Sequence, residues 1–271
     1  MSGLAAPVAT CAAPTLRIVT YNIHRCIGRD RRYLPARIGR VLGETGGDLL
    51  ALQEVPLPPE PGPSCVQEIV GAIGTPGWQW IARPTCWIDG YPVGNAVISR
   101  HPLLLRREHD LRVARREPRA ALEVGVALPS GQDLRVIATH LGLRPFERRL
   151  QIEQLIAAFA HARRERPRDA TVLLGDFNEW LSWARPMRWL ARQFPSAAPV
   201  ATFPSGRPFL ALDRIWLRPR QPGFRPTRHA SALARIASDH LPLVATIDLP
   251  LLAPGGAGAR PAADASPPVQ R

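Results

Sequence analysis

The sequence predicts a layered α/β fold, because short apolar runs rich in β-forming residues alternate along the chain with segments of helical periodicity. Eight such runs are candidate strands: 16–22, 48–54, 95–100, 121–128, 134–141, 171–178, 212–217 and 243–249. The turn-forming residues Pro129, Ser130 and Gly131 separate two of these runs, which indicates an antiparallel hairpin. A purely parallel sheet is therefore not expected.

Helical segments are recognised by apolar residues that recur at spacings of three and four. The clearest are 34–45, with Leu34, Ile38, Val41 and Leu42 on one face; 65–73, with Val66, Ile69, Val70 and Ile73; and 146–165, with Ile152, Leu155, Ile156 and Phe159. The run WLSWARPMRWL at 180–190 suggests a further helix, and WIDGYPVG at 87–94 is expected to form a loop.

The chain has 271 residues, 45% of them hydrophobic, and we expect one domain from 15 to 250. The small, proline-interrupted segment 1–14 and the Pro/Gly/Ala-rich segment 251–271 are expected to be disordered tails. The four cysteines show no C-x-x-C pair and no zinc-ligand spacing, which excludes a disulfide scaffold and favours a reducing compartment. Since no apolar run approaches the ~18 residues of a membrane span and no secretory signal is recognised, we expect a soluble, cytoplasmic monomer.

The formal net charge is +13, and all 35 basic residues are arginine. Together with the abundance of proline, alanine and leucine, this usage is typical of a coding bias across a genome rather than of selection on one surface. A basic surface nevertheless attracts polyanions such as nucleic acid or anionic lipid, and arginine binds phosphate through two parallel hydrogen bonds. The charge is therefore compatible with a phosphate-bearing substrate and with contact with anionic surfaces, but it requires neither.

Polar residues of a few types occur where the predicted strands begin or end, and one lies inside an apolar strand. They are Asn22, Glu54, His140, Asp176, Asn178, Asp213, Asp239 and His240. A carboxylate at the mouth of a buried strand is costly unless a cation, a donor or a paired charge compensates it, so these strand ends are expected to converge on one pocket. Carboxylate and amide oxygens suit a hard divalent ion, Mg²⁺ or Mn²⁺. With a histidine oriented by an aspartate, such a set meets the needs of phosphoester hydrolysis.

These residues lie in motifs that together resemble the endonuclease/exonuclease/phosphatase superfamily, whose fold is DNase I-like and exonuclease III-like. The resemblance covers 16–249 in the expected order, through TYNIH at 20–24, LQE at 52–54, GNAVISR at 94–100, THL at 139–141, GDFN at 175–178, LDRI at 212–215 and SDH at 238–240. TFP at 202–204 and NEW at 178–180 resemble a poorly characterised bacterial branch. The resemblance implies a four-layer α/β/β/α sandwich of two mixed, mostly antiparallel sheets flanked by helices.

The resemblance also implies a metal site for Mg²⁺ or Mn²⁺. Glu54 would be the principal ligand, with Asn22 beside it and Asp239 joining it. Where DNA-repair members of the superfamily carry an acid two residues after the first Asn, this chain has His24. That departure weakens the case for abasic-site repair and leaves the number of metal ions open.

The catalytic roles implied by the resemblance fall on five residues. Asp176 would orient or deprotonate the attacking water, and Asn178 would hold Asp176 or a phosphate oxygen. His240, held by Asp213, would bind the scissile phosphate and stabilise the transition state. His140 would donate to a phosphoryl oxygen.

Two further residues, Asn95 and Arg119, are candidates for substrate binding near the phosphate. For both, a plain structural reading is as good: Asn95 follows Gly94 in a possible turn, and Arg119 belongs to a solvated arginine-rich stretch. Asp213 by itself could equally pair with one of the many arginines.

The leading functional hypothesis is a divalent-metal-dependent phosphoester hydrolase, with a phosphodiesterase or nuclease placed first. The alternative within the same chemistry is a phosphodiesterase or phosphatase acting on phospholipids or inositol phosphates. A different class, a catalytically silent module that binds nucleic acid or membranes, is disfavoured because both GDFN and SDH are intact. Carbohydrate and protein hydrolases are also disfavoured, because the chain has no G-x-S-x-G motif and no nucleophilic cysteine context.

Overall fold

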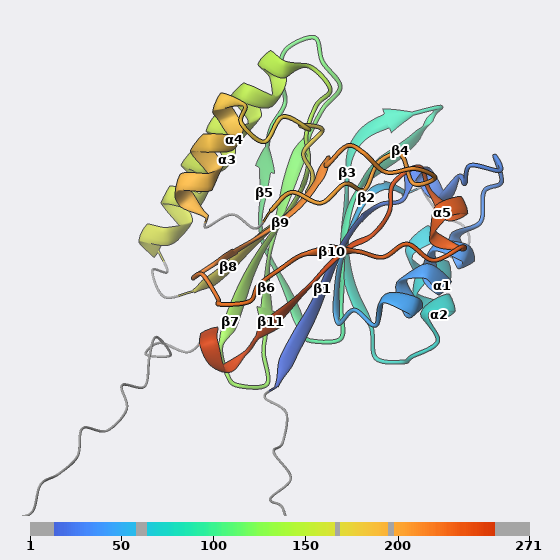
Figure 1. Cartoon of the computed structure of the whole chain (residues 1–271), viewed down its shortest axis with the longest axis horizontal. Coiled ribbons are helices and arrows are strands. Elements are labelled where there is room, and N and C mark those ends of the chain that lie inside the picture. Colours follow the sequence, from blue (N-terminus) through green and yellow to red (C-terminus); the bar gives the residue numbers. More distant parts are fainter. Residues whose placement is uncertain (1–13, 58–63, 166–168, 195–197, 253–271) are drawn as a thin grey trace, which may run out of the picture.

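The computed structural model describes residues 14–57, 64–165, 169–194 and 198–252 (Figure 1). Of the predicted tails, 1–14 lies outside the described residues except for its last residue, and 251–271 lies outside them except for its first two.

Two mixed β-sheets pack face to face and form the centre of the molecule (Figure 1). The first has the strand order β10-β11-β1-β2-β4-β3, with β1 (Thr15–Asn22), β2 (Leu49–Pro56), β3 (Gln79–Ile88), β4 (Tyr91–Ser99), β10 (Thr227–Arg228) and β11 (Leu243–Asp248). The second has the order β5-β6-β7-β8-β9, with β5 (Leu103–Asp110), β6 (Ala120–Ala127), β7 (Asp133–His140), β8 (Ala170–Asp176) and β9 (Asp213–Arg218). Among the pairs of strands in the described ranges, only β1–β2 and β7–β8 are parallel, which confirms the prediction of mixed, mostly antiparallel sheets.

Helices cover the outer face of each sheet and complete the four layers (Figure 1). The helices α1 (Pro35–Thr45), α2 (Cys65–Ile73) and the short α5 (Ala234–Ala237) pack on the first sheet. The helices α3 (Pro145–Glu165) and α4 (Arg185–Gln193) pack on the second, and the 3₁₀ turns η1 (His24–Cys26) and η2 (Pro250–Leu252) lie at loop positions. None of the helices within the described ranges is long and apolar enough to cross a membrane.

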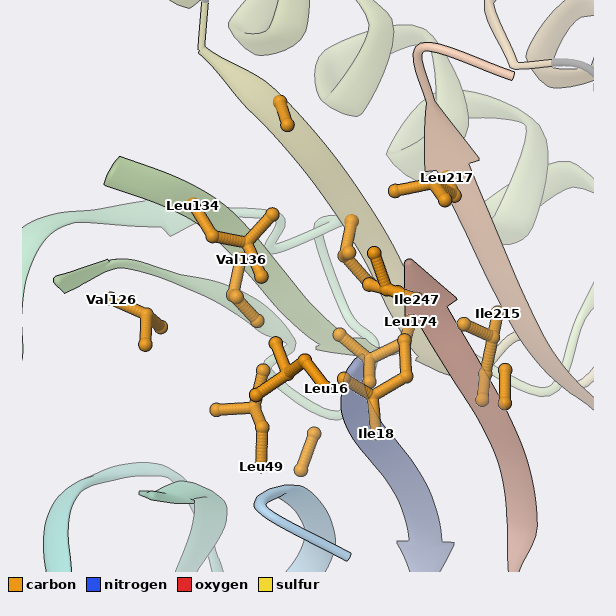
Figure 2. Packing of buried hydrophobic residues seen from close by; sticks show 14 of the residues in the cluster. Leu16, Ile18, Leu49, Val126, Leu134, Val136, Leu174, Ile215, Leu217 and Ile247 are labelled. Carbon is orange, nitrogen blue, oxygen red and sulfur yellow. The ribbon is translucent and has the colours of Figure 1, made fainter. Parts of the chain in front are cut away.

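Burial on both faces explains why the central strands are almost continuously apolar. In β1, Leu16 and Ile18 point into the core between the sheets, whereas Val19 and Tyr21 point to the helices. Figure 2 shows the core between the sheets, where Leu174 of β8 lies among side chains from both sheets. Since successive residues of a strand face opposite sides, each sheet contributes to two apolar layers.

Local signals fix the ends of the helices that the sequence predicts. Ser64 and Gln67 form a reciprocal capping box at the start of α2, where each side chain bonds the backbone N–H of the other residue. The helix α1 starts with Pro35 and ends before Gly46, whose φ of 62° is readily adopted by a residue without Cβ.

Two strands, β3 and β5, were not predicted from the apolar pattern. Each of them is an edge strand with a bulge. Pro84 and Arg83 interrupt the apolar pattern of β3, and Pro84 lies at the bulge, where a missing N–H is tolerated. The predicted loop at 87–94 is wrong: these residues end β3 and begin β4. Asp89 and Gly90, with φ of 51° and 85°, form the tight turn of this hairpin.

The strand registers bring the functional motifs to one edge of the sandwich. In the parallel pairs, Asn22 of β1 lies beside Gln53 of β2, and His140 of β7 lies beside Asp176 of β8. Because β9 runs antiparallel to β8, its first residue, Asp213, also lies beside Asp176. The two parallel pairs thus bring the carboxyl-terminal ends of their strands to this edge, and the antiparallel strand β9 brings its amino-terminal end there.

We predict that the core between the sheets carries much of the stability. Leu174→Ala is expected to lower the free energy of unfolding by about 2–5 kcal/mol, because it opens a cavity at a side chain that is fully buried. Chemical denaturation monitored by circular dichroism measures this change. The matched control Leu104→Ala, at a side chain 64% exposed on β5, should stay within about 0.5 kcal/mol of the parent; equal losses in both variants would contradict the prediction.

Candidate active site

A cavity of about 470 Å³ opens at the edge where these strand ends meet. All the predicted site residues except Asp213 line it: Asn22, Glu54, Asn95, Arg119, His140, Asp176, Asn178, Asp239 and His240. Asp213 is fully buried and contacts His240, which lies between it and the cavity. The residues predicted to converge are therefore in one place.

The side chain of Asn22 joins the two carboxylates of the site. Its Nδ2 donates to Glu54 Oε1 at 3.1 Å and to Asp176 Oδ2 at 3.0 Å. Its Oδ1 accepts from the backbone N–H of His24 at 3.0 Å. Asn22 is itself buried, so this amide fixes the relative position of the ends of β1, β2 and β8.

His240 is a buried imidazole between two carboxylates. Its Nδ1 lies 2.9 Å from Asp213 Oδ2, and its Nε2 lies 3.6 Å from Asp176 Oδ2. Burial disfavours the charged ring, but the attraction of Asp213 and Asp176 outweighs it and raises the pKa of His240 to about 10. The ring is therefore an imidazolium at neutral pH, and Thr202, which donates to Asp213 Oδ2, helps to hold its partner.

Asp176 is set up to exchange a proton near neutral pH. Burial and the nearby charge of Asp213 raise its pKa to about 6, against the opposing attraction of His240 and the hydrogen bond from Asn22. Its Oδ1 accepts from the backbone N–H of Asn178 at 2.8 Å. A carboxylate with this pKa is suited to general base catalysis.

His140 is held in the opposite charge state from His240. Burial, and then the positive charges of Arg119 and His240, lower the pKa of His140 well below its usual value, so the ring is neutral. Arg119 Nη1 lies 3.1 Å from His140 Nδ1, and because a guanidinium only donates, Nδ1 accepts and the ring proton lies on Nε2. That Nε2 is 3.6 Å from Asp176 Oδ2, on the side of the cavity. Asn178 Nδ2 lies 3.1 Å from it, but two N–H groups cannot hydrogen-bond to each other, so the Asn178 amide donates instead to the Leu141 carbonyl, at 2.8 Å.

The backbone is strained at two of these residues. Glu54 has φ of 56° and lies at the irregularity in the β2–β4 pairing between Leu52 and Val55; Asn178 has φ of 51°. Left-handed backbone is costly at Glu54 in particular, because glutamate has no special preference for it. At both positions the strain accompanies a side chain that lines the cavity.

The chemistry of the donors fits a hard divalent cation beside Glu54. This carboxylate is half-buried in the cavity wall, one of its oxygens accepts from Asn22, and in the described part of the chain it has no arginine or histidine within 4 Å. Asp239, also half-buried, lines the same cavity. Asn22 offers its nitrogen rather than its oxygen to Glu54, so here it acts as a positioning group.

A second acidic group in the site is also compact enough to hold an ion. Asp176, Asp213 and His240, all buried, have ligand atoms within 4.8 Å of one another. We interpret these three residues as a protonated histidine paired with two carboxylates and not as a metal site. The 2.9 Å contact between His240 Nδ1 and Asp213 Oδ2 already uses atoms that would otherwise bind a metal.

Several residues that hold the site were missed by the sequence analysis. The Ser238 hydroxyl donates to the Asn22 carbonyl at 2.8 Å, and Phe203 packs against the His240 ring at 4.9 Å between centroids. His24 also lines the cavity, with its Nδ1 3.0 Å from the Ile27 carbonyl. Ser238 and Phe203 lie in the SDH and TFP motifs, so the sequence could have pointed to these positions. Their contacts with Asn22 and His240 are not predictable from neighbouring residues in the sequence.

Asn95 and Arg119 occupy structural positions as well as the cavity wall. Asn95 Nδ2 donates to the Ala120 carbonyl at 3.1 Å and so ties β4 of the first sheet to β6 of the second. Arg119 pairs with Glu117 at 2.9 Å besides contacting His140. Direct substrate binding by either residue stays a prediction.

Residues 19–240 match the sequence profile of the Endonuclease/Exonuclease/phosphatase family. The chain is 32% identical over 254 residues to the uncharacterised protein YbhP of Escherichia coli K12, covering 87% of this chain and 97% of that protein.

Solved structures share the fold. An endonuclease/exonuclease/phosphatase from Beutenbergia cavernae superposes with a TM-score of 0.63 at 24% identity, over 86% of this chain and 71% of the other. The human Nocturnin catalytic domain with bound sulfate gives a TM-score of 0.61 at 19% identity, over 86% and 94%.

We predict that the two histidines titrate in opposite directions from the ordinary imidazole value. In metal-free protein, ¹⁵N NMR of the rings should show His240 protonated until about pH 10 and His140 neutral with its proton on Nε2. Asp213→Asn should lower the pKa of His240, and Arg119→Gln should raise that of His140. Two histidines that both titrate near the ordinary imidazole value would contradict the geometry described above.

Proposed function

Because the chain belongs to the endonuclease/exonuclease/phosphatase family, we propose that it is a divalent-metal-dependent hydrolase that cleaves phosphodiesters by in-line attack of water. The observation that carries the proposal is the pairing of a buried imidazolium, His240, with a neighbouring carboxylate, Asp176, whose pKa is about 6. In such a pair the carboxylate can accept a proton from the attacking water, and the imidazolium can stabilise the negative charge that develops on the phosphoryl oxygens.

In the proposed reaction each of these residues has a distinct role. Water attacks phosphorus and gives its proton to Asp176, and the ester P–O bond opposite the water breaks. The negative charge on the phosphoryl oxygens is met by the His240 imidazolium and by the Nε2–H of His140. Asn178 and Asn22 keep Asp176 oriented, through the hydrogen bonds at 2.8 Å and 3.0 Å.

Glu54 and Asp239 are the residues that we propose to hold Mg²⁺ or Mn²⁺, with Asn22 positioning Glu54. The bound ion would supply Lewis-acid neutralisation of charge on the phosphate oxygens. Oxygen donors are the ligands that both ions prefer.

The cavity wall bears on the choice between the two substrate classes that the sequence left open. The lining also includes apolar side chains, which are Ile88, Val93, Leu143, Phe203, Leu210 and Leu212. Its two arginines each have an acidic partner: Arg25 pairs with Asp89 at 2.8 Å, and Arg119 pairs with Glu117. A nuclease groove needs cations free to follow a phosphate backbone. The wall therefore supports a phosphodiester that carries an apolar group, as a phospholipid does, as the second candidate beside a nuclease.

We predict hydrolysis of bis-p-nitrophenyl phosphate in the presence of Mg²⁺ or Mn²⁺. His240→Ala and Asp176→Asn should each lower kcat/KM by about 10²–10⁴-fold, because they remove charge stabilisation and the base. The matched control His101→Ala, in the turn after the far end of β4, should keep the parent rate. No release from a broad panel of phosphoesters, or equal rates in the parent and His240→Ala, would refute the proposal and revive the silent binding module.

We predict that metal dependence resides in Glu54. EDTA should abolish the activity, and Glu54→Gln should raise the Mg²⁺ concentration for half-maximal rate by at least about tenfold. Titration of the rate with Mg²⁺ in both proteins measures this. An unchanged Mg²⁺ requirement in Glu54→Gln, with fold verified by circular dichroism, would place the ion elsewhere.

A further inference from the structure

Large apolar side chains lie exposed around the mouth of the cavity. Leu143, Trp180, Trp183 and Phe209, which we call the rim, are 68%, 49%, 72% and 71% exposed. Single exposed apolar residues are common on soluble proteins, but several around one opening mark an interaction site.

The rim residues come from three separate segments that contribute to the cavity lining. Leu143, between β7 and α3, and Trp180, between β8 and α4, line the cavity themselves. Phe209 precedes the lining residue Leu210. Trp183 follows Trp180 on the same loop. The rim is therefore continuous with the cavity.

Exposed arginines lie on loops that carry rim residues or residues lining the cavity. Arg144 follows Leu143, Arg207 lies two residues before Phe209, and Arg115 lies in the loop between β5 and β6 that also carries the lining residues Glu117 and Arg119. Among the described residues, the guanidinium groups of Arg144, Arg207 and Arg115 form no ion pair, so their charge is available to an anionic partner.

We propose that the rim docks the protein on the surface of an anionic phospholipid bilayer, with the mouth of the cavity facing the lipid. Tryptophan, phenylalanine and leucine side chains partition into the interface between headgroups and acyl chains. Arginines beside them bind lipid phosphates, and the net charge of +13 draws the whole protein to an anionic surface.

The composition of the rim favours a bilayer over single-stranded nucleic acid. Leu143 offers no ring for a base, and Arg148 lies over the Trp180 ring at 6.0 Å from its centroid, so Trp183 and Phe209 are the rim side chains that base stacking would have to use. Apolar side chains also line the cavity itself, among them Phe203, Leu210 and Leu212, which suits a lipid and not a sugar–phosphate backbone.

Docking in this sense needs no hydrolysis, so it can be tested apart from the proposed function. Co-sedimentation is measured with vesicles of phosphatidylcholine, with and without phosphatidylglycerol. The parent should bind the anionic vesicles and not the neutral ones. The Asp176→Asn variant should bind as the parent does, even if it is inactive.

The decisive variants compare the rim with an equally exposed residue elsewhere. Trp183→Ser with Phe209→Ser should weaken vesicle binding by at least about tenfold, because two apolar contacts are lost. Leu104→Ser, on the edge strand β5, should bind as the parent does. Arg144→Ser with Arg207→Ser should weaken binding to anionic vesicles, and thermal unfolding of each variant verifies its fold.

Three results would overturn the proposal. One is absence of parent binding to anionic vesicles. Another is equal binding by the rim double variant and Leu104→Ser. The third is loss of affinity for a single-stranded oligonucleotide in the rim variant while vesicle binding is unchanged, which would identify the rim as a nucleic-acid surface.

Discussion

The face-to-face packing of the two sheets is the constraint on which the rest of the structure depends. It buries the inner faces of both sheets in one apolar layer and fixes how their strand ends meet. Because β1–β2 and β7–β8 are the parallel pairs, the ends of these strands carry Asn22, Glu54, His140 and Asp176 to one edge. The packing of the apolar faces of the two sheets therefore determines where the polar residues of the cavity lie.

That edge holds buried charge, and it is stable because each charge is compensated. Asp213 meets the His240 imidazolium at 2.9 Å and accepts from Thr202, while Asn22 donates to both Glu54 and Asp176. An unpaired carboxylate in such a place would cost several kcal/mol. The same neighbouring charges keep His240 protonated and His140 neutral. A cation and a neutral donor therefore flank Asp176, the carboxylate that we propose as the base.

The sequence predicts the buried strands well and identifies residues that the structure brings to one cavity, but it does not predict features that depend on tertiary contacts. Central strands such as β8 are apolar on both faces, and their polar ends are conspicuous; β3 and β5 are edge strands whose arginines, proline and bulges hide the pattern. The support of Asn22 by Ser238 joins residues 216 positions apart, which no local pattern reveals. The roles of Asn95 and Arg119 were ambiguous for the same reason, since their partners lie in other strands.

The central claim is that His240 acts as an imidazolium held by Asp213, while the metal ion binds beside Glu54. The most direct test is anomalous diffraction from crystals soaked with Mn²⁺ and a slowly hydrolysed phosphodiester analogue. The account predicts a manganese peak in contact with Glu54 and Asp239, with the phosphate next to His240 and His140. Manganese bound instead between Asp176, Asp213 and His240 would contradict it, because His240 would then be a metal ligand and could not carry the charge assigned to it.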